Sequence, residues 1–259
     1  MINIFRGFLI GLANLVPGVS GATMAVIVGV YERLIDAVAN FVKFRFKREQ
    51  ISFIVALGIG ILAAIFAGSV SMKHLLERSP AMAYAIFFGL VLGSIPRLRR
   101  EISDLKLRHF ALGVSLMLIF ELLVRTVQLS GTYVLLTGII AACAMILPGL
   151  SGSLVLLILG VYDDILDALV NLKLAIVLPF GIGVILGIAL MALLMNWLVG
   201  KFPNQTRSFT FGLVVASIIK LEPFTKQSMN LVGFALVLLI VSVTVYLSFR
   251  LSYRSSARR

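Results

Sequence analysis

Two copies of a Pro-Gly-x-Ser-Gly sequence, at residues 17–21 and 148–152, are the part of this chain best suited to chemistry. Proline ends a helix and glycine permits a tight turn, so each copy is predicted to be a tip between two helices. Serine favours the N-cap position, so the helix after each tip should begin with free amides and a positive dipole end, which suits phosphate. The alternative is that each copy only builds a turn. The predicted anion-binding residues are Pro17, Gly18, Ser20, Gly21, Ala22, Thr23, Pro148, Gly149, Ser151, Gly152 and Ser153.

Acidic and amide side chains recur every four residues after each tip, which places them on one face of a predicted helix. They are Glu32, Asp36, Asn40, Asp163, Asp167 and Asn171. A polar stripe of this kind suits a water path or a proton path, and it equally suits the solvated face of a helix that leaves the membrane. The solvated face is the favoured interpretation for the two asparagines, and both interpretations stay open for Asp36 and Asp167.

Glu121 and Arg125 form a charged pair in the first half of the chain, where the second half has only uncharged residues. Glu121 lies about 20 Å along a helix from Arg108. An ionised group within the hydrocarbon costs roughly 2.5–3.5 kcal/mol, so an acid at this depth is a functional candidate by default. Arg125 is four residues away and offsets part of that cost, or it reaches the outer interface. We therefore predict a coupling role for Glu121, and a substrate contact for Arg125.

The elements that position these residues must be membrane helices. Hydrophobic residues make up 60% of the 259-residue chain, the mean hydropathy is +1.09, and only 13% of residues are charged. A helix of about 20 apolar residues crosses a ~30 Å hydrocarbon core. Full-length spans are predicted at residues 51–72, 109–127, 174–199 and 230–249, and shorter ones at 81–95 and 208–219.

The chain contains an internal repeat. The two tips match at an offset of 131 residues, and so do Gly29-Val30-Tyr31 and Gly160-Val161-Tyr162. Further along, Gly89 and Gly212 match at an offset of 123 residues, because the first half has a longer basic loop at 43–50. We therefore predict one membrane domain of two repeats, at residues 1–128 and 129–259.

The distribution of charge decides the topology. If each tip re-enters the membrane and leaves on its own side, 17 of the 23 Lys and Arg residues lie on one face, as the positive-inside rule requires. If each broken segment spans instead, the basic residues divide almost evenly. The predicted fold is therefore an all-α integral membrane protein with two inverted-topology repeats. Each repeat has one re-entrant helical hairpin and three transmembrane helices, and both termini are cytoplasmic.

Composition also excludes several classes of function. The net charge of +12 comes mainly from short loops between apolar segments, so nucleic acid is not an expected partner. Cys143 is the single cysteine, so neither a disulfide nor a thiolate metal site is expected. His74 and His109 are interpreted as surface residues. No phosphate-binding Walker sequence occurs, so no nucleotide or other cofactor is predicted.

The tips followed by Gly29-Val30-Tyr31-Glu32, together with their second copy, resemble the bacterial membrane family known as "domain of unknown function 368". The resemblance covers nearly the whole chain. It implies a polyprenyl-phosphate translocase of the bacterial inner membrane, whose partners are the bilayer and the lipid. It further implies that undecaprenyl phosphate returns from the outer to the inner leaflet. Because the sequence has no Walker motif, any energy for this step is expected from ion or proton gradients or from downhill flow.

Two other functions stay open. One is a membrane phosphatase similar to undecaprenyl-pyrophosphate phosphatase, which carries an arginine where this chain has Gly21 and Gly152. Without that arginine, hydrolysis is not expected. The other is a small-ion or water channel with two half-helices, which the tips alone would also allow. Whether the chain forms a homo-oligomer is likewise left open.

Overall fold

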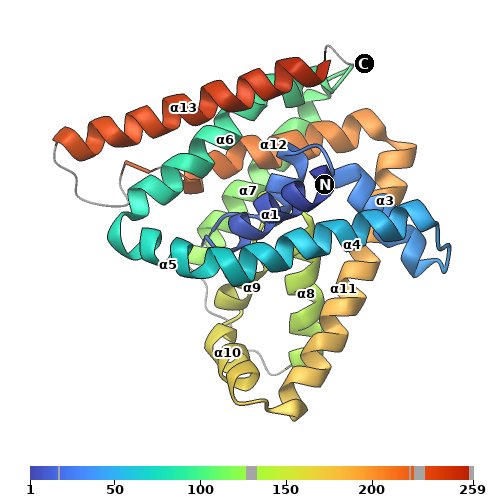
Figure 1. Cartoon of the computed structure of the whole chain (residues 1–259). Coiled ribbons are helices and arrows are strands. Elements are labelled where there is room, and N and C mark those ends of the chain that lie inside the picture. Colours follow the sequence, from blue (N-terminus) through green and yellow to red (C-terminus); the bar gives the residue numbers. More distant parts are fainter. Residues whose placement is uncertain (17, 127–132, 222, 225–230, 257–259) are drawn as a thin grey trace.

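The computed structural model describes residues 1–16, 18–126, 133–221, 223–224 and 231–256, and within these ranges all regular structure is helical (Figure 1). The first half contains α1 (Ile2–Asn14), α2 (Gly21–Ile27), α3 (Tyr31–Val42), α4 (Arg48–Ala63), a π-helical turn η1 (Ala64–Gly68), α5 (Ser69–Arg78), α6 (Pro80–Arg100) and α7 (Leu107–Thr126). The second half contains α8 (Val134–Ile146), α9 (Gly152–Ile158), α10 (Tyr162–Val170), α11 (Leu174–Lys201), α12 (Pro203–Leu221) and α13 (Leu231–Ser256).

Each Pro-Gly-x-Ser-Gly sequence lies between a longer and a shorter apolar helix. Helices α1 and α8 each have 13 residues, and α2 and α9 each have 7. At ~1.5 Å per residue a 13-residue helix is about 20 Å long, which is too short for a ~30 Å hydrocarbon core. An amphipathic helix, α3 or α10, then follows each short helix.

Within the described part of the chain, three helices are long and apolar enough to cross a membrane: α4 with η1 and α5 as one 31-residue segment, α6, and α11. The prediction of a short span at 81–95 underestimates α6, which has 21 residues. The helix continues through Arg97, Arg99 and Arg100, because arginine is a good helix former and a cation is stabilised at a helix C-terminus. In the same way the predicted span at 208–219 is the apolar part of α12, which has 19 residues.

Helices pack both within each half and between the two halves. Within each half, α1 packs on α4 and α8 packs on α11. Between the halves, α6 packs along α13 and α12 packs along α7, and Figure 1 shows α13 lying beside α6. Small residues allow the close approaches, as where Gly138 of α8 meets Gly183 of α11.

The first tip and its helices lie in the largest core cluster, which joins both halves. Its buried side chains include Val16, Met24, Val30, Phe53, Phe87, Met195, Phe211 and Val214.

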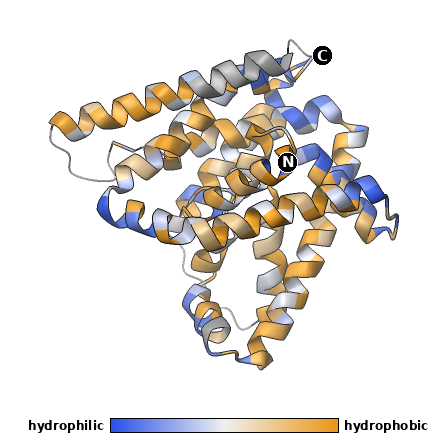
Figure 2. Cartoon of the chain, in the orientation of Figure 1, coloured by the Kyte–Doolittle hydropathy of each residue, from blue (hydrophilic) through white to orange (hydrophobic). Residues whose placement is uncertain are grey.

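The molecule also has polar ends. Figure 2 shows hydrophilic residues where α3 meets α4 and where α6 meets α7, at the right and upper right, and again at α5 and α10, at the left and bottom. Hydrophobic ribbon fills the region between them.

Candidate functional site

The two tips meet inside the protein. The Gly149 amide of the second tip donates a buried hydrogen bond to the Thr23 hydroxyl, just after the first tip, over 2.7 Å. The Tyr31 hydroxyl donates to the Ile146 carbonyl at the end of α8, over 3.2 Å. Residues separated by more than 110 positions in the sequence are therefore joined by direct contacts at the centre of the bundle.

Glycine is required at the turn of each tip. Gly18 has φ of +79° and Gly149 has φ of +86°, a left-handed conformation that costs other residues roughly 1–2 kcal/mol. Pro148 is fully buried, whereas Pro17 lies outside the described residues. The predicted tips are therefore tight turns that lead directly into α2 and α9.

The hydrogen bonds at the tips differ from those predicted. Ser20 and Ser151 stand at the N-cap positions, but neither side chain bonds an amide of its helix. The Gly21 amide instead donates to Asn14 Oδ1 over 3.0 Å, so the predicted free amide at Gly21 is already occupied. The Ser20 hydroxyl is buried and has no hydrogen-bond partner among the described residues.

The second tip is more open than the first. Ser151 and Gly152 are half-buried, Ser153 is exposed, and the two serine hydroxyls lie 2.9 Å apart. Where the first half has Asn14, an offset of 131 residues gives Met145. A side chain at residue 152 would contact the Met145 Cβ at 3.5 Å. Asn14 was not among the predicted site residues, although a polar amide at the end of an apolar helix is a signal that the sequence offers.

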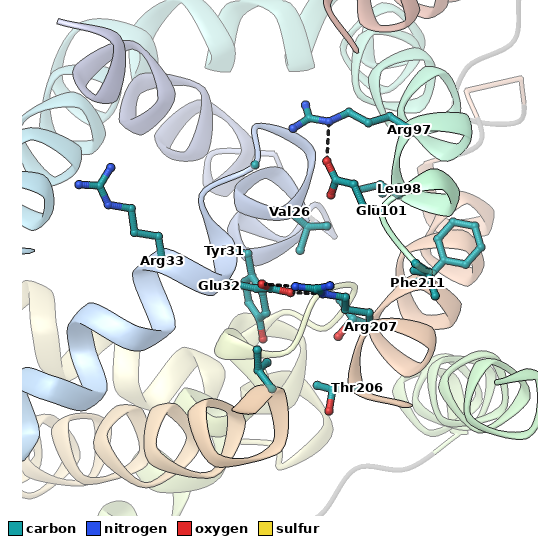
Figure 3. Close-up of a pocket in the computed structure, with 14 residues that line it drawn as sticks. Val26, Tyr31, Glu32, Arg33, Arg97, Leu98, Glu101, Thr206, Arg207 and Phe211 are labelled. Atoms are coloured by element: carbon teal, nitrogen blue, oxygen red, sulfur yellow. Dashed lines mark hydrogen bonds and ion pairs between the residues drawn. The ribbon is translucent and has the colours of Figure 1, made fainter. Parts of the chain in front are cut away.

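A cavity of about 250 Å³ opens beside the first hairpin, by which we mean α1, the first tip, α2 and α3, and the predicted tip residues do not line it (Figure 3). The second hairpin is the corresponding set of α8, the second tip, α9 and α10. It lies between the α2–α3 corner, the C-terminal end of α6 and the start of α12. Its lining residues are Val26, Gly29, Tyr31, Glu32, Arg33, Arg97, Leu98, Glu101, Ile102, Val199, Thr206, Arg207, Thr210 and Phe211. Three arginines against two glutamates give it a net positive charge, which suits an anionic group.

The cavity is crossed by a bidentate ion pair between the two halves. Arg207 Nε and Nη2 of α12 donate to Glu32 Oε1 and Oε2 of α3, over 2.7 and 2.9 Å, and Figure 3 shows the two side chains facing each other. A planar guanidinium matches a phosphate in the same two-point manner as it matches a carboxylate. Glu32 therefore occupies a position that a phosphate could take.

Arg97 connects α6 to the first hairpin. Its Nε donates to Glu101 Oε1 over 3.0 Å, and its Nη1 donates to the Ile27 carbonyl at the end of α2 over 3.3 Å. Its Nη2 would lie only 2.6 Å from a Cβ at Gly29, whose φ is +72°. Gly29 thus allows the guanidinium to reach the hairpin. The third arginine, Arg33, stacks over the Phe53 ring, with its guanidinium carbon 4.2 Å from the ring centroid.

The aspartates of the predicted polar stripes are held by amide donors. Asp36 Oδ2 accepts from Gln50 Nε2 over 2.7 Å, and Oδ1 accepts from Asn40 Nδ2 over 3.2 Å and from Asn196 Nδ2 of α11 over 3.4 Å. The Asn196 contact ties α3 to the second half.

Asp167 in the second half also accepts hydrogen bonds from two side chains. It accepts from Asn171 Nδ2 over 2.6 Å and from Lys173 Nζ over 2.5 Å. The hydrogen bond from Lys173, supported by its charge and by Asn171, lowers the pKa of the exposed Asp167 carboxyl. Asp163 is exposed at the start of α10.

Glu121 is half-buried in α7 and is not among the residues that line the cavity. Arg125 also belongs to α7, and its side chain lies outside the described residues. Arg97 and Arg207 line the cavity but lie just outside the spans predicted at 81–95 and 208–219, and neither was among the predicted site residues. Among the described residues no cluster of histidine, cysteine or acidic side chains could hold a metal ion.

The described residues form an all-helical bundle with apolar spans and with a cavity of net positive charge at the junction of the two halves, an arrangement typical of a membrane protein. A family model described as undecaprenyl phosphate translocase-like matches residues 10–235, and the chain belongs to that family. Its membership and its apolar helices make it a bacterial membrane protein.

Two relatives carry the name polyprenyl-phosphate transporter. The protein of Vibrio cholerae serotype O1 is 31% identical over 242 residues, which cover 85% of this chain and 76% of the relative. The protein of Staphylococcus aureus is 29% identical over 270 residues, which cover 95% of each chain. No solved structure matches the chain.

Proposed function

We propose that this protein is a transporter that returns undecaprenyl phosphate, or a related polyprenyl phosphate, from the outer to the inner leaflet of the bacterial inner membrane. The observation that carries the proposal is the basic cavity between the first hairpin, α6 and α12. Arg97 and Arg207 come from different halves of the chain and both point toward the hairpin (Figure 3). The names of the two relatives support the same substrate.

We propose that the two halves are inverted repeats, each with a re-entrant hairpin and three spanning helices, and that both termini are cytoplasmic. The equal lengths of α1 and α8, and of α2 and α9, support this arrangement. So does the reciprocal pairing of α6 with α13 and of α12 with α7. The polar ends seen in Figure 2 are consistent with a bilayer between them.

The substrate site includes the cavity and the paired tips. The phosphate replaces Glu32 at Arg207 and contacts Arg97. The polyprenyl chain stays in the lipid, because the spanning helices expose apolar side chains. The phosphate headgroup can pass the centre of the protein only when the hydrogen bond between Thr23 and Gly149 breaks, because that bond holds the two tips together. Arg125 and the residues of both tips, Pro17, Gly18, Ser20, Gly21, Ala22, Thr23, Pro148, Gly149, Ser151, Gly152 and Ser153, belong to the path.

Energy comes from coupled protons or ions. An acid within the hydrocarbon is costly when ionised, so Glu121 is the first candidate for the coupling group. The other candidates are Glu32, Asp36, Asp163 and Asp167. Glu32 and Asp36 connect the first hairpin to α12 and α11, so a change in their charge alters contacts between the halves.

The protein is a transporter and not a phosphatase. At the position where the similar phosphatases carry an arginine, the first tip has Gly21, whose amide bonds Asn14. A residue without a side chain cannot hold the oxygens of a transferring phosphoryl group. The basic cavity also argues against a simple channel, since a water or cation path needs no cluster of three arginines.

Reconstituted liposomes test the proposal directly. Polyprenyl phosphate is placed in both leaflets, and a soluble phosphatase added outside hydrolyses only the exposed fraction. With the protein present, the inner-leaflet fraction should also become accessible. Arg97→Gln combined with Arg207→Gln should slow this exchange at equal incorporation. Phosphate release from the corresponding polyprenyl pyrophosphate, in vesicles without added phosphatase, would indicate an enzyme. Ion flux without lipid exchange in the same vesicles would indicate a channel.

A further inference from the structure

The connection between α3 and α4 alternates aromatic and basic side chains. Residues 41–48, here called the aromatic–basic turn, read Phe-Val-Lys-Phe-Arg-Phe-Lys-Arg. The three phenylalanines Phe41, Phe44 and Phe46 are 57%, 82% and 55% exposed. Their rings pack edge-to-face, with centroids 5.2 Å apart for Phe41 and Phe46 and 6.3 Å apart for Phe44 and Phe46. They form an exposed aromatic cluster surrounded by four cations.

The backbone of this turn is strained in a way that pushes one ring outward. Phe44 has φ of +56°, in the left-handed region. The Phe44 amide donates to the Phe41 carbonyl over 3.0 Å and the Arg45 amide to the Asn40 carbonyl over 2.8 Å, which together form a Schellman helix end. Glycine is the usual residue at that position. A phenylalanine that is 82% exposed recovers little of the cost by packing within the protein.

The position of the turn identifies what contacts these rings. The 31-residue apolar segment begins at Arg48 and its uncharged stretch begins at Ile51, so the turn lies at the border between headgroups and water. Apolar side chains such as phenylalanine, when they lie beside cations, are buried at the boundary between headgroups and acyl chains. Clusters of Lys and Arg beside a membrane helix attract anionic lipid. Neutral lipid would satisfy the rings alone. A zwitterionic headgroup carries a phosphate too, but its ammonium cancels the net charge, so it attracts the four cations less than an anionic headgroup does.

We propose that the aromatic–basic turn is a binding site for the headgroups of anionic phospholipids in the membrane that surrounds α4. The rings enter the headgroup region, and Lys43, Arg45, Lys47 and Arg48 hold the lipid phosphates. The same corner in the second half provides a contrast. There Leu172, 75% exposed with φ of +49°, is followed by only one cation, Lys173.

Fluorescence quenching by brominated lipid tests this site. The single natural tryptophan is first changed by Trp197→Phe, and a probe is added by Phe44→Trp. The full-length protein is placed in vesicles that contain both phosphatidylglycerol and phosphatidylcholine, with one or the other brominated. Brominated phosphatidylglycerol should quench the probe several-fold more strongly than its share of the lipid predicts. Neutralising all four cations to Gln should abolish the preference and leave quenching by both lipids.

Leu172→Trp in the same Trp197→Phe background is the matched control, because it occupies the same left-handed helix end. Its fluorescence should be quenched in proportion to lipid composition. The proposal is overturned if the Phe44→Trp probe is quenched in proportion to composition with its four cations intact. It is equally overturned if neither lipid quenches that probe, or if the Leu172→Trp probe shows the same preference. Circular dichroism of each variant establishes that the helices remain.

Discussion

The Thr23 hydroxyl accepts a hydrogen bond from the Gly149 amide over 2.7 Å, and this hydrogen bond joins the two tips of the molecule. Both groups are buried, so neither is compensated by water when the bond breaks. The bond also links a side chain of the first half to a backbone amide of the second. Any motion that separates the halves at their centre must break it.

Thr23→Val should destabilise the protein by about 1–3 kcal/mol, because it keeps the shape of the side chain and leaves the Gly149 amide without its acceptor. Thermal unfolding in detergent measures the effect, and Thr23→Ser should restore most of the loss. Thr137→Val is the matched control. The Thr137 hydroxyl bonds the Tyr133 carbonyl, which also accepts the Thr137 amide over 2.9 Å, so its removal should cost less. An equal cost for both valine variants would contradict a special role for Thr23.

Glu32→Gln should tighten binding of the phosphate headgroup while it slows transport. Glu32 occupies both arms of the Arg207 guanidinium, so substrate must displace it. A partly exposed ion pair is worth ~0.2–1 kcal/mol, so the affinity gain should be up to about fivefold. Binding is measured with inorganic phosphate and with the lipid, and exchange is measured in liposomes. Arg207→Gln should instead weaken binding. Weaker binding by Glu32→Gln would show that Glu32 supports the site and does not compete for it.

Gly29→Ala should impair binding beyond its effect on stability. Its φ of +72° makes any side chain costly by roughly 1–2 kcal/mol, and a Cβ would also lie 2.6 Å from Arg97 Nη2. Gly160→Ala is matched to it, because Gly160 has φ of +67° at the corresponding corner of the second hairpin. Both variants should lose similar thermal stability, and Gly29→Ala should lose more headgroup affinity. Equal headgroup affinities in the two variants would show that Arg97 does not contact the headgroup.

Residues 47 and 163 should lie on opposite faces of the membrane if the hairpins are inverted. In a Cys143→Ser background, Lys47→Cys and Asp163→Cys each give one exposed thiol. A membrane-impermeant maleimide added to intact cells should label the Asp163→Cys variant. It should leave the Lys47→Cys variant unlabelled until the membrane is opened. Labelling of both positions from the same side would end the inverted-repeat proposal.

Glu121→Gln should flatten the pH dependence of lipid exchange and leave the fold intact, if Glu121 carries the coupled proton. Exchange is measured across a range of pH in liposomes, alongside thermal unfolding. Glu77→Gln is the control, because Glu77 is an exposed acid that faces Lys73 at 3.9 Å and should not affect the profile. Wild-type pH dependence in Glu121→Gln would return this residue to a structural role.

The local features of the site could be predicted from the sequence, and the contacts between distant segments could not. Proline and glycine located both tips, because those residues restrict the backbone wherever they occur. The sequence also identified Thr23 and Glu32 as candidates. Their partners, Gly149 and Arg207, lie 126 and 175 positions away, and no local pattern specifies such pairs.

The lengths of α6 and α12 were underestimated for a related reason. A span predicted from hydropathy ends at the first run of polar residues. A helix can continue beyond that point, for as long as its backbone hydrogen bonds and the helix propensities of its residues permit. Arg97 therefore falls outside the predicted span at 81–95, although it lies in the last turn of α6. That last turn brings it to the Ile27 carbonyl, and so to the cavity.

The reciprocal packing of α6 with α13 and of α12 with α7 has a consequence for how the protein is made. The ribosome completes α6 long before α13. More than a hundred further residues must be synthesised before the helix that packs along α6 is available. During that interval α6 lacks the helix it will pack along, and α7 lacks α12. Assembly of the first half is thus completed only after the second is inserted, and a chain that stops before α13 leaves one face of α6 without the helix that covers it.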